Sequence, residues 1–220
     1  MATTAAELQT RLAYRLGENS APSDANEKAR RLSFLNEGLR EVYKQAYFWF
    51  TQKIDTSLDT VASQETYTLP TDFRDIIEVR VDGKIAVAIP QHEAFGSYNY
   101  PPLYYQYNSL VQSYFIFGET ELHLIPVPST TGTNNISLRY YSYPTAMTVD
   151  ASTTLIPDQY VDLLVAYAFG RVSQIDSERG SAADGFDEFT NTIRLMMQEN
   201  MKRKMFNRSL LPTLPTSIVE

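Results

Sequence analysis

Two histidines, His92 and His123, are the first residues to test for chemistry in this cysteine-free chain of 220 residues. Glu93 follows His92, but no second histidine stands at helical spacing, so the zinc-protease pattern is absent. His123 lies in the alternating segment 122–125, which predicts a surface or cross-strand histidine. The lack of cysteine excludes disulfides, thiolate nucleophiles and cysteine-based zinc sites.

Phosphate-binding and nucleophile motifs are also missing from the sequence. The nine glycines do not cluster into a phosphate loop, and no Gly-x-Ser-x-Gly elbow occurs. Asp72, Asp75 and Glu78 could bind a cation, but acidic residues are expected around a turn and a strand, so we predict no metal site. The sequence therefore predicts a protein that is not an enzyme and needs no cofactor.

Tyrosine is concentrated in one part of the chain, where nine of the fifteen fall between residues 98 and 143. The densest group is Tyr98, Tyr100, Tyr104, Tyr105 and Tyr107. Aromatic strand residues can stack nucleic-acid bases, but no Lys or Arg stands between residues 85 and 138 to neutralise phosphates. A subunit or tail interface and an ordinary half-buried sheet are equally consistent with the group. A single-stranded nucleic-acid or carbohydrate-binding module is the alternative hypothesis.

Charge is unevenly distributed, although the net charge is −7. Residues 53–165 contain 5 basic and 13 acidic side chains, a net of −8, whereas residues 194–220 contain 5 basic and 2 acidic, a net of +3. An acidic body does not attract duplex phosphates. The basic end either binds an acidic partner or nucleic acid, or is a solvated helix end. No signal peptide and no apolar run of about 20 residues is present, so we expect a protein made in the cytoplasm, with no membrane partner.

Helices are predicted at both ends of the chain. Thr4 and Glu7 have the spacing of a capping box, and Gly17 ends the helix that follows. Asp24 begins a second helix that continues to about residue 50. Its apolar stripe consists of Leu32, Leu35, Leu39, Val42, Ala46 and Trp49. A third helix begins at Pro157, and a fourth ends at about Lys204.

The middle of the chain alternates apolar and polar residues at period two, which predicts six or more short strands. Asp82-Gly83 is a strong hairpin signal, and the strand at 136–140 is predicted to pair with the one at 122–125. We therefore predict an α+β protein with a four-helix platform, an inserted antiparallel β-sheet or barrel and an extended C-terminal tail. The predicted helical domain spans 1–51 and 153–204, the β-rich domain spans 52–152, and the tail spans 205–220.

Several phrases of the sequence, taken in order, resemble the head–tail adaptor proteins of tailed bacteriophages. They are residues 34–42 (FLNEGLREV), 67–73 (YTLPTDF), 79–83 (VRVDG), 122–128 (LHLIPVP), 138–144 (LRYYSYP) and 156–165 (IPDQYVDLLV). The resemblance covers roughly residues 30–175. The large β portion looks most like the adaptor, or tail tubular, proteins of short-tailed phages.

The resemblance implies a structural protein of the virion neck: a homo-oligomeric ring, usually a dodecamer, between the portal protein and the tail nozzle. Viral DNA passes through such a ring without sequence-specific binding, and the acidic body agrees with that role because it repels DNA. A Pro-punctuated tail is able to add along a portal surface as an extended peptide. The predicted portal-docking residues are Lys202, Arg203, Lys204, Arg208, Leu210, Leu211, Leu214 and Ile218.

Overall fold

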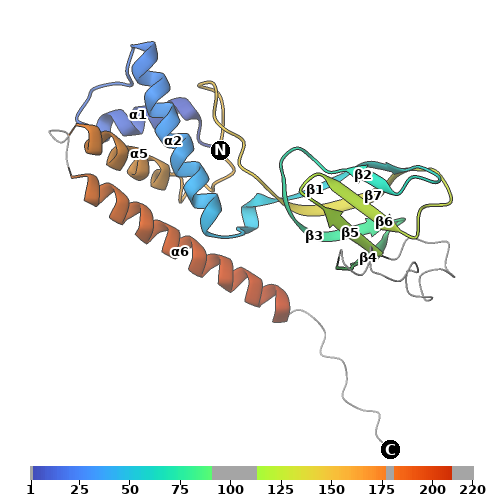
Figure 1. The fold of residues 1–220 in the computed structure, drawn as a ribbon. Helices are drawn as coiled ribbons and strands as arrows, with labels where there is room; N and C mark the ends of the chain where they lie inside the picture. Colours follow the sequence, from blue (N-terminus) through green and yellow to red (C-terminus); the bar gives the residue numbers. More distant parts are fainter. Residues whose placement is uncertain (1, 91–112, 177–180, 210–220) are drawn as a thin grey trace, which may run out of the picture. The chain divides into compact units, whose positions relative to one another are not determined.

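The computed structural model describes residues 2–90, 113–176 and 181–209, with side chains up to Lys204 in the last helix. The chain is α+β, as predicted, and forms two compact units (Figure 1). One unit combines the two chain ends, up to Phe50 and from Pro144 onward. The other is Thr51–Tyr143.

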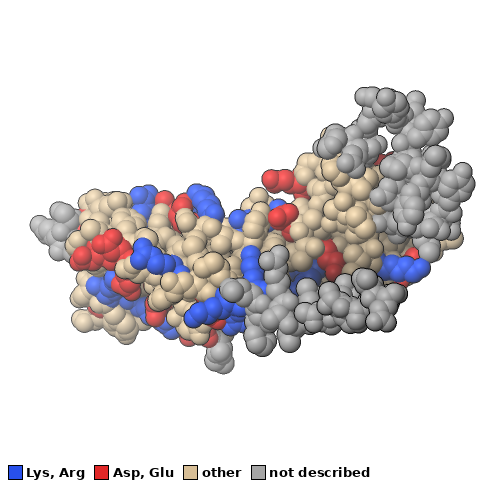
Figure 2. Space-filling model, turned by 90° about the horizontal axis from the view of Figure 1, so that it is seen from below, with Lys and Arg blue, Asp and Glu red and all other residues tan. Residues whose placement is uncertain are grey.

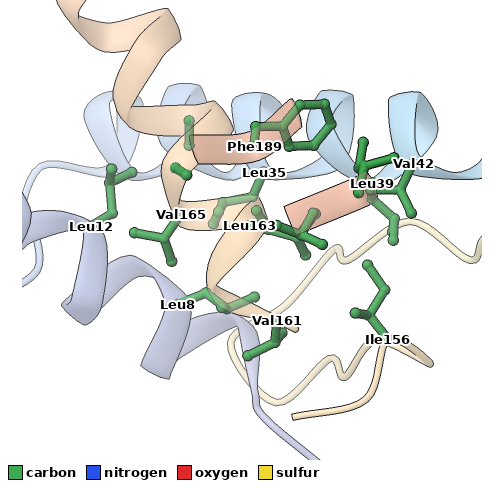
Figure 3. Close-up of a cluster of buried hydrophobic side chains, with 14 of the residues drawn as sticks. Leu8, Leu12, Leu35, Leu39, Val42, Ile156, Val161, Leu163, Val165 and Phe189 are labelled. Atoms are coloured by element: carbon green, nitrogen blue, oxygen red, sulfur yellow. The ribbon is translucent and has the colours of Figure 1, made fainter. Parts of the chain in front are cut away.

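Four helices are described in the unit built from the chain ends. They are α1 (Ala5–Arg15), α2 (Ala25–Gln45), α5 (Asp162–Ile175) and α6 (Ala182–Ser209). Helix α5 contacts α1, α2 and α6, and apolar side chains occupy nearly its whole circumference. Figure 3 shows side chains from the front and rear of the sequence meeting in one core, which includes Leu8, Leu35, Leu163 and Phe189. Burying these side chains is the main favourable term that joins the two ends.

The predicted helix starts are confirmed for α1 and α2. The Thr4 hydroxyl accepts from the Glu7 backbone N–H at 3.3 Å, and the Glu7 carboxylate accepts from the Thr4 N–H at 2.9 Å, which completes the capping box. The Asp24 carboxylate accepts from the Glu27 N–H at 2.8 Å. Gly17, just beyond α1, has a φ of 78°, which a glycine adopts without strain.

Three predicted helix boundaries are wrong. Helix α2 ends at Gln45, because Ala46 is extended and the chain returns through a short 3₁₀ helix, η1 (Trp49–Thr51), to bury Phe48 in the core. Helix α5 begins at Asp162 rather than at Pro157, because residues 157–161 form a turn whose Asp158 carboxylate binds Thr3. Helix α6 continues to Ser209, beyond the predicted end at Lys204, since no Gly or Pro occurs between Lys204 and Pro212.

The second unit is a seven-stranded sheet. Its strands are β1 (Gln52–Thr60), β2 (Thr66–Thr68), β3 (Phe73–Val81), β4 (Lys84–Ala88), β5 (Ser113–Phe117), β6 (Glu121–Ile125) and β7 (Gly132–Ser142). Their order in the sheet is β1-β7-β3-β4-β5-β6-β2. The predicted hairpin is confirmed between β3 and β4: Val81 pairs with Lys84, and Asp82 and Gly83 both have positive φ, as a type I′ turn requires.

Two predictions about the sheet are wrong. Strand β7 pairs with β1 and β3 and not with β6, because long strands pair along their whole length and β6 already lies between β5 and β2. Strands β4 and β5 are parallel, whereas we predicted an antiparallel sheet. The long connection from Ile89 to Gln112 permits this, since parallel neighbours need a crossover of a dozen or more residues.

Candidate assembly interface

The described part of the predicted docking set lies at the end of α6. Lys202, Arg203 and Lys204 are all exposed, but consecutive helical residues point in different directions and do not form one face. Figure 2 shows basic and acidic side chains interspersed over the face of the helical unit that it presents. Arg208 lies in α6 beyond the last described side chain. The other four predicted docking residues, Leu210, Leu211, Leu214 and Ile218, lie outside the described residues.

Arg203 is engaged within its own chain. Its guanidinium donates to the Glu199 carboxylate at 2.5 and 2.9 Å and lies 4.5 Å above the ring of Trp49. This arrangement assigns Arg203 a bracing contact between α6 and the aromatic residues that follow α2. Lys202 and Lys204 have no such contact among the described residues, and they are therefore the better candidates for a docking role.

Glu199 joins α6 to the turn that precedes α5. The Tyr160 hydroxyl donates to the Glu199 carboxylate, and the Gln159 amide donates to it at 3.3 Å. The hydrogen bonds from Tyr160 and Arg203 lower the pKa of Glu199, and the same Tyr160 bond raises the pKa of the tyrosine. At the next residue of α6, the Asn200 amide donates to the Tyr47 carbonyl at 2.9 Å. The base of the basic segment is thus fixed to the helical unit.

We expect Tyr160→Phe to change how stability depends on pH. A carboxyl whose folded pKa is depressed stabilises the fold above its unfolded pKa, here about 4.5, and this stabilisation is lost as the pH falls through the folded pKa. The variant should lose about 1 kcal/mol at pH 7 and should then decline less steeply than the wild type below pH 4.5. Urea unfolding across this pH range measures both effects. Tyr14→Phe, at an exposed position on α1, is the control. If Tyr160→Phe and the wild type lose stability equally steeply below pH 4.5, the Tyr160 hydrogen bond does not lower the pKa of Glu199.

The tyrosine group predicted as a subunit or tail interface lies outside the described residues, as does His92. The described part of the sheet presents a different apolar pair, Ile85 and Val87 of β4, which are 60% and 58% exposed. The two-residue turn sets this orientation: Val79 pairs with Ala86, so Ala86 faces the core and its neighbours face outward. The hairpin signal and the buried alternation of β3 contained this information, but our sequence prediction did not use it.

His123 is a cross-strand histidine, as predicted. Leu122 and Leu124 are fully buried, while His123 lies on the opposite face and stacks on Phe115 with ring centroids 4.4 Å apart. Its ring nitrogens lie 3.2 Å from a Glu65 carboxylate oxygen and 3.4 Å from one of Glu121. These contacts give His123 a role in holding β5, β6 and the residues before β2 together.

Two of the three acidic residues considered for a cation, Asp72 and Glu78, form ion pairs, and Asp75 accepts from the Ile76 N–H at 2.9 Å. Asp72 accepts from Lys53 at 2.5 Å and from the Tyr140 hydroxyl at 3.0 Å, and Glu78 accepts from Arg80 at 2.5 Å. Burial raises the pKa of Asp72, but the bonds from Lys53 and Tyr140 outweigh it, so that the pKa lies below its ordinary value. Within the described ranges, no group of three or more His, Asp or Glu side chains is arranged to hold a metal ion.

The model of the SU10 adaptor protein family matches residues 3–211 and thus extends over both units. The chain therefore belongs to the SU10 adaptor protein family. This membership supports a head–tail adaptor of a bacteriophage, a structural virion component and not an enzyme.

No curated protein matches the chain. Among the described helices, none has the length and apolar character needed to cross a bilayer.

Proposed function

We propose that copies of this chain form a ring, a dodecamer, that joins the portal to the tail nozzle in the neck of a short-tailed phage virion. The observation that carries the proposal is the family match over residues 3–211, which includes both the helical unit and the sheet. The helical unit supplies a rigid body, because side chains from all four described helices share one core. The exposed pair Ile85 and Val87 provides apolar surface for contact with a neighbour.

Viral DNA passes through this ring without sequence-specific binding. The net charge of −7 supports this, because an acidic wall repels phosphates and does not retain DNA in transit. Native mass spectrometry of the protein, alone and mixed with the portal of the same phage, tests the ring. The expected result is a twelve-subunit species that forms a joint complex with the portal. Monomers in both samples would contradict the proposal.

Portal docking is assigned to the basic end of α6 and the segment that follows. Lys202 and Lys204 are exposed on a helix end that the Glu199 and Asn200 contacts hold in place. The apolar residues Leu210, Leu211, Leu214 and Ile218 follow within reach of the same partner surface. An ordered base reduces the entropy that docking must overcome, since the end of α6 is already fixed to the helical unit.

We expect K202E/K204E to weaken portal binding by about tenfold or more, mainly through slower and more salt-sensitive association. The matched control is R40E/K44E, which makes the same charge change on exposed positions of α2. Surface plasmon resonance against immobilised portal measures both variants. A third variant that ends at Ser209 removes the tail while keeping α6 complete, and we expect it to lose portal binding and to keep its melting temperature. If K202E/K204E and R40E/K44E bind the portal equally well, Lys202 and Lys204 do not take part in docking.

A further inference from the structure

A groove of about 590 Å³ lies on the helical unit, away from the end of α6 that carries the basic residues. It is formed by α1, the first turns of α2 and the loop at 148–151, and its walls are largely apolar. The lining residues used below are Gln9, Ala25, Lys28, Ala29, Leu32 and Val149. An ion pair of 2.5 Å between Lys28 and Asp150 links the helix wall to the loop wall.

The loop wall is preformed. Backbone N–H groups of Ala5 and Ala6 donate to the carbonyls of Ser152 and Asp150 at 2.8 and 3.1 Å. Within the loop, the Ser152 hydroxyl accepts from the N–H groups of Thr148 and Val149 at 3.2 and 3.1 Å. The loop therefore stays in place without a ligand, and Val149 keeps 61% of its surface exposed beside the groove.

Gln9 is the unusual residue of the groove. It is fully buried, yet neither its amide nitrogen nor its amide oxygen has a hydrogen-bond partner among the described residues. A buried primary amide without partners is costly, so its polar atoms indicate a missing donor and a missing acceptor. A carboxamide presents the two side by side, which matches the N–H and C=O of an extended peptide. The chemistry therefore favours a peptide with an apolar side chain as the ligand.

The segment that follows α6 has the composition of such a peptide. Residues 210–220 contain Leu210, Leu211, Leu214 and Ile218 and only one charged residue. Pro215 disfavours the helical conformation for Leu214, which nevertheless keeps its own N–H and C=O. The two prolines lack N–H groups and so leave fewer donors to satisfy in an apolar groove.

Chain length decides which copy supplies the segment. Arg203 lies over Trp49, past the end of α2, whereas the groove is at the start of α2, roughly 30 Å away along the 21-residue helix. A further six residues of α6 add about 9 Å before the segment begins. Leu214 is five residues past the end of α6, and five fully extended residues span at most about 18 Å, so the chain's own Leu214 does not reach this groove. A neighbouring copy avoids this restriction.

We propose that the groove binds residues 210–220 of a neighbouring copy, with the Gln9 amide turning out of its buried position to bond the Leu214 main chain and the Leu214 side chain between Ala29, Leu32 and Val149. The inference rests on the proposed ring, because it requires a second copy alongside. Docking of the same segment on the portal then releases it from the groove, so that the free adaptor protects its tail until the portal arrives.

The test is binding of a fluorescent synthetic peptide of residues 209–220 to the full-length protein, followed by polarisation. We expect saturable binding that Gln9→Leu weakens by about tenfold or more, because two hydrogen bonds are lost. Gln9→Leu keeps the side-chain size and removes only unpartnered polar atoms, so it should fold. Ser173→Ala is the matched control, since it removes another buried unpartnered group outside the groove. Ala29→Phe, which fills the groove from an exposed position, should also abolish binding.

Two results would overturn the groove assignment: no binding of the peptide, or equal binding by the wild type and Gln9→Leu. The second result would mean that the Gln9 amide is satisfied by water alone. A peptide that binds the portal but not this protein would overturn the inference and leave the proposed portal docking intact. Absence of a ring in native mass spectrometry would contradict the proposed function. The peptide titration tests the groove separately.

Discussion

Arg31→Met is expected to lower the free energy of unfolding of the helical unit by about 2–4 kcal/mol. The Arg31 side chain is 2% exposed, and its guanidinium makes three charge-assisted hydrogen bonds. Two go to the Glu18 carboxylate at 2.7 and 2.8 Å, and one goes to Glu27 at 2.8 Å. Methionine keeps the apolar stem but leaves both carboxylates without this partner.

The carboxylates moderate the expected loss. Breaking a fully buried ion pair costs about 3–5 kcal/mol, but Glu18 and Glu27 are 28% and 25% exposed and regain some hydration. The pKa of Arg31 is raised by its bonds to Glu18 and Glu27 despite the opposing effect of burial, so the residue stays charged at every practical pH. Because Glu18 lies in the connection between α1 and α2, this contact fixes where α2 starts relative to α1.

The matched control for Arg31→Met is Arg30→Met. Arg30 is the next residue along α2 and also bonds to Glu27, at 2.7 Å, but its side chain is 44% exposed. Exposed pairs contribute about 0–1 kcal/mol, so this variant should unfold close to the wild type. Urea unfolding followed by circular dichroism compares the two at pH 7. If both variants lose the same stability, burial of Arg31 is not what makes its contacts strong.

Local signals in the sequence predict those parts of the fold that depend on a few neighbouring residues. The Thr4–Glu7 capping box and the Asp82-Gly83 hairpin are confirmed, because side chain and backbone within four residues decide each of them. The α+β class follows from the change of apolar period near residue 51. These inferences need no knowledge of what lies across the core.

Long-range choices are the part that the sequence does not reveal. Nothing near β7 distinguishes β6 from β3 as its partner, since all three strands alternate in the same way. The end of α2 depends on Phe48 being buried by helices from the far end of the chain. In the same way, composition predicts a basic segment at the end of the chain, but it does not predict that Arg203 packs over the Trp49 ring. The docking residues themselves stay a prediction.

Gly185→Ala is expected to destabilise the helical unit by about 1–3 kcal/mol, because it forces α5 and α6 apart. A Cβ at Gly185 would lie 2.7 Å from the Ala166 carbonyl oxygen and 2.8 and 2.9 Å from the backbone N and Cα of Gly170. All three atoms belong to the backbone of α5, which cannot rotate away as a side chain does. Alanine has the higher helix propensity by about 1 kcal/mol, so any net loss must come from this close approach.

Gly170→Ala, on the facing helix, is the matched comparison for this contact. Its Cβ would meet the Phe186 ring at 3.0 and 3.1 Å, and a ring can shift by a few tenths of an ångström. We therefore expect a change of less than about 1 kcal/mol for Gly170→Ala and the larger loss only for Gly185→Ala. Thermal unfolding of the two variants measures the difference. Because α6 also carries the Asn200–Tyr47 and Arg203–Trp49 contacts, displacement at Gly185 should loosen the basic end of α6 and weaken the proposed portal binding. Equal stability of the two variants would mean that α5 and α6 do not approach this closely.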